Sequence, residues 1–230
     1  PEQLKPMTKG ELQPEMIPKR TRDGRVVKQG TGGMTGGPDT YHGYGLAWAN
    51  ASNTPFREYK HWVHEGGISS PLIAHWPSGI GEKRHGKLES QPGHLIDLMA
   101  TCVDLGQAAY PEKVGDTAIV PMQGTSLAPA FNGKKIGRKI PIYWEHEGNR
   151  AVRLGDWKLV SEGNTGWELY DMKSDRTELN DLAASNPEVL ERMSQMYEDW
   201  AERVGALPWP VVREVTAAPR PGSVHIHDVR

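Results

Sequence analysis

The pattern of hydrophobic and polar positions predicts ordered elements mainly after residue 70. Apolar residues recur every three or four positions over 94–106, which predicts an amphipathic helix. A second helix is expected to begin at Asn186, with Pro187 at its first position and Glu188 in its first turn. Its apolar positions continue to about Val204, so the chain is expected to end in a long helix followed by a tail.

Short runs rich in β-branched and aromatic residues predict strands. The run at 70–76 is almost wholly apolar and is expected to be a strand buried on both faces. Further strands are expected at 140–145, 150–154, 157–160 and 167–171, with Gly155 and Asp156 forming a tight hairpin turn. The predicted fold class is α/β: the end of a large mixed sheet, then a small antiparallel sheet packed by a C-terminal helix.

The composition of the first segment differs from that of the rest. Residues 1–45 are rich in Pro, Gly and charge, so they bury too little apolar surface to fold alone. Because Tyr41, Tyr44 and Trp48 need packing partners, this segment is interpreted as an extended loop over a neighbouring part rather than a free linker. The expected divisions after it are 46–139, the C-terminal part of an α/β domain; 140–207, a small antiparallel-sheet subdomain with its helix; and 208–230, a tail.

Composition excludes several classes of function. The 230 residues carry a net charge of −2, so no basic surface favours nucleic acid, and no apolar run is long enough to span a membrane. The single cysteine excludes an internal disulfide, and Cys102 is expected to be a buried, inert thiol in the helix over 94–106. Eight Trp against two Phe suit either a carbohydrate-binding surface or an aromatic core.

Lys60 stands in the most informative segment, ahead of the triplet Glu65-Gly66-Gly67. A compact ammonium group stabilises negative charge that gathers on an anionic ester during reaction. A solvated loop lysine is the alternative interpretation. The two glycines permit positive φ and close backbone approach, and Glu65 is expected to hold a neighbouring amide.

Histidine and arginine residues form a second set of candidates. His146 follows an expected strand and lies in an expected polar loop, with Arg150 four residues later. Such loops often hold specificity residues, so both are candidates for substrate contact, with a surface turn as the alternative. His61 and His64 flank Lys60 but have no evident third ligand, so no metal site is assigned to them.

The ordered succession of motifs resembles the C-terminal half of type I sulfatases of the bacterial arylsulfatase kind, over roughly residues 38–204. The matching positions are 53–57, Lys60, 65–68, 71, 76–77, 94–101, 124–127, 150–153, 155–160, 168–171, 175, 178, 180 and 182. The resemblance implies an alkaline-phosphatase-like sulfatase fold and hydrolysis of sulfate esters. It implies that Lys60, five residues before Glu65, contacts the sulfate group, with Glu65, Gly66 and Gly67 shaping the site.

The resemblance also implies parts that this sequence lacks. The family nucleophile is a formylglycine made from a Cys/Ser-x-Pro-x-Arg motif, which Cys102, Ser70 and Ser185 do not match. The calcium of the complete enzyme needs acidic ligands and an Asp-Asn pair, which are not in this chain either. We therefore expect a fragment that needs an N-terminal sulfatase half, acts with it on aryl or glycan sulfates, and is inactive alone. Family members of this type are often periplasmic or secreted.

Two other functions fit the same residues. A phosphodiesterase or phosphonate hydrolase of the same superfamily would also present a tetrahedral oxyanion to Lys60. A non-catalytic carbohydrate-binding or assembly module would instead use the Trp residues. The upstream sequence distinguishes the first alternative, and glycan affinity without turnover would favour the second.

Overall fold

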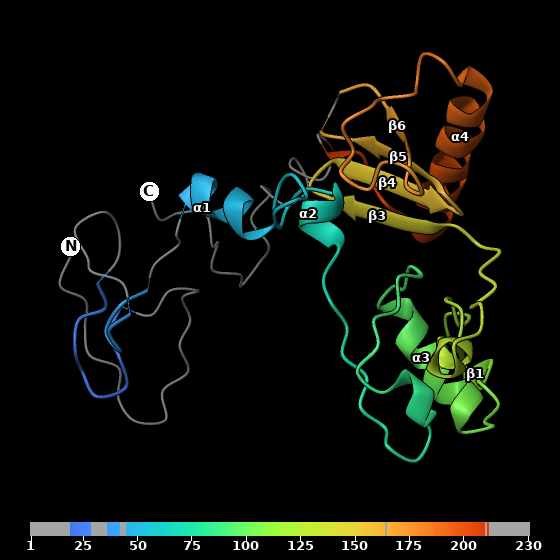
Figure 1. Ribbon diagram of the computed structural model, residues 1–230, viewed down its shortest axis with the longest axis horizontal. Helices are drawn as coiled ribbons and strands as arrows, with labels where there is room; N and C mark the ends of the chain where they lie inside the picture. Colours follow the sequence, from blue (N-terminus) through green and yellow to red (C-terminus); the bar gives the residue numbers. More distant parts are fainter. Residues whose placement is uncertain (1–18, 29–35, 42–44, 164, 210, 212–230) are drawn as a thin grey trace. The chain divides into compact units, whose positions relative to one another are not determined.

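The computed structural model describes residues 19–28, 36–41, 45–163, 165–209 and 211 (Figure 1). The chain divides into two compact units, one made of Pro1–Thr54 with Pro210–Arg230 and the other of Pro55–Trp209. The second unit carries every candidate site residue. Among the described residues, no helix combines the length and the apolar character needed to cross a lipid bilayer.

The described part of the first unit holds little regular structure. Two isolated bridges join Arg20 to Val26 and Lys28 to Thr40. The helix α1 (Gly45–Ser52) was not expected from the pattern and buries none of its residues. The packing expected for the aromatic residues is absent here: Trp48 is 68% exposed and Tyr41 is also exposed, whereas Tyr44 lies outside the described residues.

A four-stranded antiparallel sheet forms the centre of the second unit. Its strands are β3 (Ile142–His146), β4 (Asn149–Leu154), β5 (Trp157–Ser161) and β6 (Glu168–Asp171), paired in chain order. The hairpin at 155–156 is confirmed. A second hairpin, missed in the sequence, joins β3 to β4 through Glu147 and Gly148, both at positive φ as a two-residue primed turn requires. His146 therefore ends a strand rather than lying in a loop.

Both faces of this sheet are covered, because neighbouring apolar residues of a strand point to opposite faces. On one face, Val152 and Leu159 pack against Met193 and Tyr197 of the helix α4 (Pro187–Val204). This helix is confirmed with its expected bounds, and Figure 1 shows it lying along the sheet. The other face is covered by residues that precede and form the short helix α2 (Glu65–Ile68). The residues packed there are Val63, Ile68, Trp144, Ala151, Val160, Tyr170 and Met172.

A smaller group of elements lies between α2 and the sheet in sequence. It comprises η1 (Glu82–Arg84), α3 (Ile96–Leu105), β1 (Lys113–Val114), β2 (Thr117–Ala118) and η2 (Ala128–Asn132). Asp97, fully buried on α3, accepts hydrogen bonds from the backbone N–H groups of His94 (2.7 Å) and Thr125 (2.8 Å) and pairs with Arg138. Polar contacts of this kind hold α3 against the 124–138 segment.

The expected helix over 94–106 is confirmed, but its predicted buried face is wrong. The residues buried on α3 are Asp97, Ala100 and Thr101. Leu95 is 78% exposed, and Cys102 is exposed rather than buried. The reason is that the hydrogen bonds of Asp97 and Thr101 anchor the opposite side of the helix, so the apolar side faces outward.

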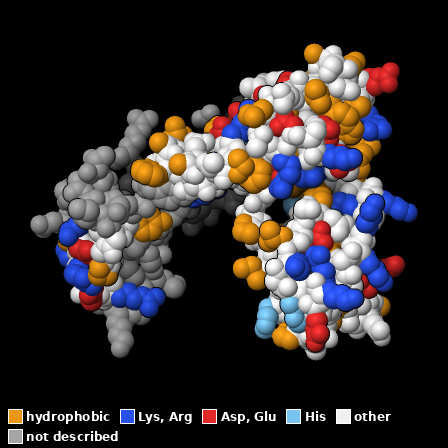
Figure 2. Space-filling model, viewed as in Figure 1, with side chains coloured by type: hydrophobic (Ala, Val, Ile, Leu, Met, Phe, Trp, Pro, Cys, Tyr) orange, Lys and Arg blue, Asp and Glu red, His pale blue; other side chains and the backbone are white. Residues whose placement is uncertain are grey.

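The strand expected at 70–76 does not form. The segment pairs with no strand among the described residues, and Ile73 is 91% exposed, with Leu72 and Trp76 exposed beside it. A strand requires a neighbour to receive its backbone hydrogen bonds. The apolar sequence alone therefore did not determine the local structure. Figure 2 shows hydrophobic side chains reaching the surface at several places on the face in view.

Candidate functional site

A tight turn carries Lys60. The N–H of Trp62 donates to the carbonyl of Tyr59 at 3.1 Å, and the Lys60 side chain between them is exposed. Glu58 precedes the turn with φ of 70°, and His61 lies within it with φ of 98°, the left-handed region that non-glycine residues seldom adopt. Such backbone conformations persist only where the surrounding structure enforces them, and they concentrate at functional sites.

The two glycines of α2 enforce this turn from beneath. A Cβ atom on Gly66 would overlap the carbonyl oxygen of Arg57, and a Cβ on Gly67 would lie 2.7 Å from the carbonyl oxygen of Tyr59. Neither glycine has positive φ, so of the two freedoms that glycine offers only close approach is used here. Their role is close approach: any larger residue would separate α2 from the Lys60 turn.

Glu65 is the centre of a buried ionic network. Its Oε1 lies 3.1 Å from Lys158 Nζ, and its Oε2 lies 3.3 Å from Arg176 Nη2. Lys158 Nζ also lies 2.8 Å from Glu178 Oε1, and Oε2 of Glu178 accepts the backbone N–H of Glu65 at 2.7 Å. The Glu65 carboxylate therefore pairs with cations. It is Glu178 that accepts a backbone N–H, that of Glu65, whereas the sequence led us to expect Glu65 to hold a neighbouring amide.

The pKa values of the two carboxyl groups move in opposite directions. Burial acts to raise the pKa of Glu65, but the charges of Lys158 and Arg153 outweigh it and lower that pKa overall. Burial raises the pKa of Glu178, and its contact with Lys158 offsets this only in part. Glu65 is thus the more firmly ionised of the two, and the network fixes the start of α2 to β5.

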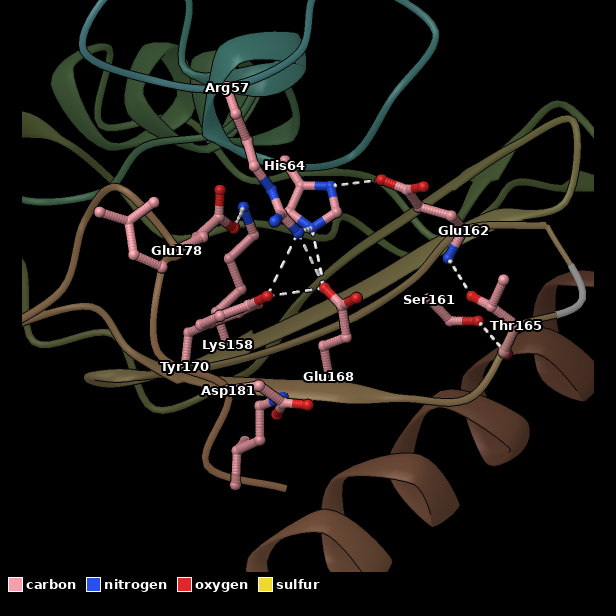
Figure 3. Close-up of polar contacts among 12 residues, drawn as sticks. Arg57, His64, Lys158, Ser161, Glu162, Thr165, Glu168, Tyr170, Glu178 and Asp181 are labelled. Carbon is pink, nitrogen blue, oxygen red and sulfur yellow. Dashed lines mark hydrogen bonds and ion pairs between the residues drawn. The ribbon is translucent and has the colours of Figure 1, made fainter. Parts of the chain in front are cut away.

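A second, partly exposed cluster surrounds the buried His64 (Figure 3). Arg57 Nη2 contacts His64 Nε2, and it donates to Glu168 Oε2 at 2.9 Å and to the Tyr170 hydroxyl at 3.2 Å. Tyr170 in turn donates to Glu168 at 2.7 Å, and His64 Nδ1 lies 3.0 Å from Glu162. The cluster ties the segment before α2 to β6 and to the end of β5.

Burial is the largest cause of the shifted pKa values of His64 and Glu162. Burial, followed by the charge of Arg57, lowers the pKa of His64 to about 4, so this histidine is neutral near pH 7. Burial, followed by the charges of Glu58 and Glu168, raises the pKa of Glu162. A neutral His64 accepts a hydrogen bond from Arg57, which makes it a structural acceptor rather than a cation.

His61 meets residues of the β3–β4 hairpin. Its ring centroid lies 5.2 Å from that of His146, and its Nδ1 lies 3.0 Å from Glu147 Oε2. One ligand atom each of His61, His146 and Glu147 lie within 4.8 Å of one another, an arrangement able to hold a metal ion. The pairing of His61 with His64 considered from the sequence is not the one found, since His64 is buried in the cluster described above.

Arg150 points to the opposite face of the sheet. Its guanidinium carbon lies 4.6 Å from the Trp167 ring centre and 5.7 Å from that of Tyr197, and Nη2 donates to Ser161 at 3.0 Å. Of these partners, Tyr197 lies on α4 and Ser161 on β5. The structure therefore brings His146 next to His61, the neighbour of Lys60, whereas Arg150 packs against Trp167 and Tyr197.

Several residues that hold the site were not singled out in the sequence. Lys158 is a charged residue within the apolar strand β5, yet its side chain is fully buried. Because side chains alternate along a strand, Lys158 lies on the same face as Val160. That lysine on a buried face was a readable signal for a carboxylate partner. Glu178 and Arg57 carried no such signal, because the pairs they form span more than a hundred residues.

Comparison with known proteins identifies a family match. Residues 57–203 match the family described as N-sulphoglucosamine sulphohydrolase, C-terminal. An uncharacterized sulfatase of Schizosaccharomyces pombe is 28% identical over 174 residues, which cover 73% of this chain and 31% of that protein. An N-acetylgalactosamine-6-O-sulfatase of Bacteroides thetaiotaomicron is 25% identical over 158 residues, covering 62% and 29%.

Two further matches cover a smaller share of the chain than the first relative does. An arylsulfatase of Klebsiella aerogenes is 29% identical over 100 residues, covering 43% of this chain and 21% of that protein. A solved 2-O GAG sulfatase aligns at 30% identity with a TM-score of 0.34, covering 48% of this chain and 25% of that one. The chain spans about a third or less of the length of these curated relatives.

Proposed function

The chain belongs to the sulfatase family as a C-terminal region, and on that premise we propose that Lys60 contacts the sulfate group in a complete sulfuric ester hydrolase. The observation that carries the proposal is the combination of an exposed Lys60 with a backbone that Gly66 and Gly67 lock in place. A fixed ammonium group stabilises charge on sulfate oxygens without reorganising during the reaction. Glu65 is a structural residue in this proposal, since its carboxylate is committed to Lys158 and Arg176.

His146 is the second residue that we assign to the substrate side. Its ring contacts that of His61, which directly follows Lys60. A substrate bound at Lys60 would therefore have His146 within the same surface region. Arg150 was a candidate on sequence grounds, but its stacking on Trp167 and Tyr197 supports a packing role.

We assign the nucleophile and the calcium to the upstream half of the complete protein. Calcium takes hard oxygen ligands, whereas the candidate ligand group in the described residues offers two imidazoles and a single carboxylate. These residues do not fit calcium. The name of the Bacteroides thetaiotaomicron relative favours a sulfated glycan as substrate over a simple aryl sulfate.

The test compares this chain with the complete protein that contains it. Both are assayed on 4-nitrophenyl sulfate, on sulfated N-acetylhexosamines and on a phosphodiester. We expect sulfate release by the complete protein and none by the chain alone. Turnover of a sulfate ester by the purified chain would overturn the division of roles, and preference of the complete protein for the phosphodiester would overturn the reaction class.

A further inference from the structure

Three potential ligands converge beside the Lys60 turn. They are His61, which follows Lys60, His146 at the end of β3, and Glu147 in the β3–β4 turn. One ligand atom from each lies within 4.8 Å of the other two. Bonds of about 2.0–2.2 Å set the ligand atoms around a tetrahedral ion about 3.4 Å apart, so these side chains would draw together slightly to bind one.

The backbone places these ligands before any ion is present. His61 has φ of 98° and Glu147 has φ of 53°, so both side chains project from uncommon backbone conformations. Behind them, the buried Asn149 donates from Nδ2 to the backbone carbonyls of His61 (3.2 Å) and His146 (3.0 Å). One amide group thereby fixes the two histidines relative to each other.

Asn149 also contacts the His61 ring. Its Nδ2 lies 3.2 Å from His61 Nε2, so its two amide hydrogens are shared among this nitrogen and the two carbonyls. Asn149 is itself held, because its Oδ1 accepts the N–H of Gly163 at 3.1 Å. The opposite ring nitrogen, Nδ1, lies 3.0 Å from Glu147, so the imidazole and the carboxylate already face each other.

The donor set selects the kind of ion. Two imidazole nitrogens and one carboxylate suit zinc, nickel or copper, whereas calcium and magnesium prefer oxygen ligands throughout. The exposure of His146 and Glu147 leaves room for water or a ligand oxygen at the remaining coordination positions. We propose that His61, His146 and Glu147 form a binding site for a divalent transition-metal ion, distinct from the calcium of the family. The proposal stands apart from the assignment of Lys60, because it concerns metal binding by this chain alone.

The experiment measures metal binding by the full 230-residue chain. Because the sequence also carries His225 and His227 two residues apart, the parent protein for the test is His225→Ala/His227→Ala. Zinc is titrated by calorimetry, and cobalt is titrated in parallel by its visible d–d absorption bands. We expect one zinc ion per chain, binding that is lost at acidic pH, and cobalt bands of a four- or five-coordinate site.

The variants His61→Ala, His146→Ala and Glu147→Gln should each weaken zinc binding at least about 10-fold. The matched control is His75→Ala, which removes an exposed histidine outside the group and should bind as the parent does. Circular dichroism checks each fold, and Glu147→Gln keeps the shape of an exposed side chain if a histidine variant misfolds. Absence of zinc binding by the folded parent overturns the proposal. So does binding that these substitutions leave unchanged, which would mean adventitious surface binding.

Discussion

Lys158 Nζ lies 3.1 Å from Glu65 Oε1, and both side chains are buried, so an ion pair shielded from water joins β5 to α2. The same ammonium group reaches Glu178 at 2.8 Å. Gly67, two residues after Glu65 in the same helix, packs on the turn that carries Lys60. The position of the exposed lysine therefore depends on a buried one about a hundred residues later in the sequence.

Lys158→Met should destabilise the chain by about 3–5 kcal/mol, because it leaves two buried carboxylates without their common cation. Urea unfolding followed by circular dichroism measures the loss. The control Lys173→Met changes an exposed lysine, and its free energy of unfolding should lie within about 0.5 kcal/mol of that of the wild type. Adding Glu178→Gln to Lys158→Met should recover part of the loss, since it removes one stranded charge. A Lys158→Met protein as stable as the control would contradict the network.

Gly66→Ala should be far more damaging than its single methyl group suggests. The added Cβ would overlap the Arg57 carbonyl and lie 2.5 Å from that of Glu58, so α2 has to shift away from the Lys60 turn. We expect more than about 2 kcal/mol of destabilisation in urea unfolding. Gly166→Ala is the matched control, because a Cβ there meets nothing within 4 Å. Equal stability of the two variants would show that the close approach is unimportant.

Local signals predicted the C-terminal elements well. The hairpin at 155–156 and the helix beginning after Asn186 follow from turn residues and helical periodicity, and both formed as expected. The reasoning about caps was less accurate, since the Asn186 side chain makes no capping bond to α4 and donates instead to the Leu182 carbonyl. Periodicity identifies an element because packing requires it, even where the detailed cap differs.

Long-range signals were the ones missed. The segment 70–76 reads as a buried strand, but a strand depends on partners, and none pairs with it in the described residues. The apolar stripe of α3 predicted a buried face, yet Asp97 and Thr101 determined which side was covered. The contact of His61 with His146 joins residues far apart in sequence, so no spacing rule could have indicated it.

Acidification should destabilise the chain through His64. Its pKa is about 4 in the folded protein, compared with about 6.5 for an exposed histidine. The unfolded chain therefore binds the proton first, and the stability contributed by neutral His64 is present above pH 6.5 and declines as the pH falls toward 4. Because the raised pKa of Glu162 acts in the opposite sense, the comparison is with His64→Gln.

His64→Gln should unfold with a flatter pH dependence than the wild type between pH 6.5 and 4, in urea titrations at a series of pH values. His85→Gln alters an exposed histidine and should leave the wild-type slope unchanged. If the two variants gave the same slope as the wild type, His64 would not be the titrating group.

The apolar surface around 72–76 and α3 should bind a hydrophobic dye. Leu72, Ile73, Leu95 and Met99 are all exposed, and surfaces of this kind usually meet a partner. Leu72→Ser/Ile73→Ser should lower the fluorescence of an added naphthalene-sulfonate dye, whereas Lys87→Ser should not. Addition of the upstream half of the protein should also lower the signal if it covers this surface. Fluorescence as low as that of a compact control protein would contradict the exposure.

Lys60→Ala in the complete enzyme should reduce kcat by about 10²–10³-fold, the effect of removing one preorganised electrostatic contact to the transition state. Lys60→Arg should recover only part of the rate, because a planar guanidinium group cannot replace a compact ammonium without displacing its neighbours. Lys87→Ala removes another exposed lysine and should leave kcat and KM unchanged. A rise in KM alone would mean that Lys60 binds ground state and transition state equally. If a folded Lys60→Ala enzyme kept both kinetic constants, the sulfate-contacting role of Lys60 would be wrong, and the locked turn above Gly66 would need another explanation.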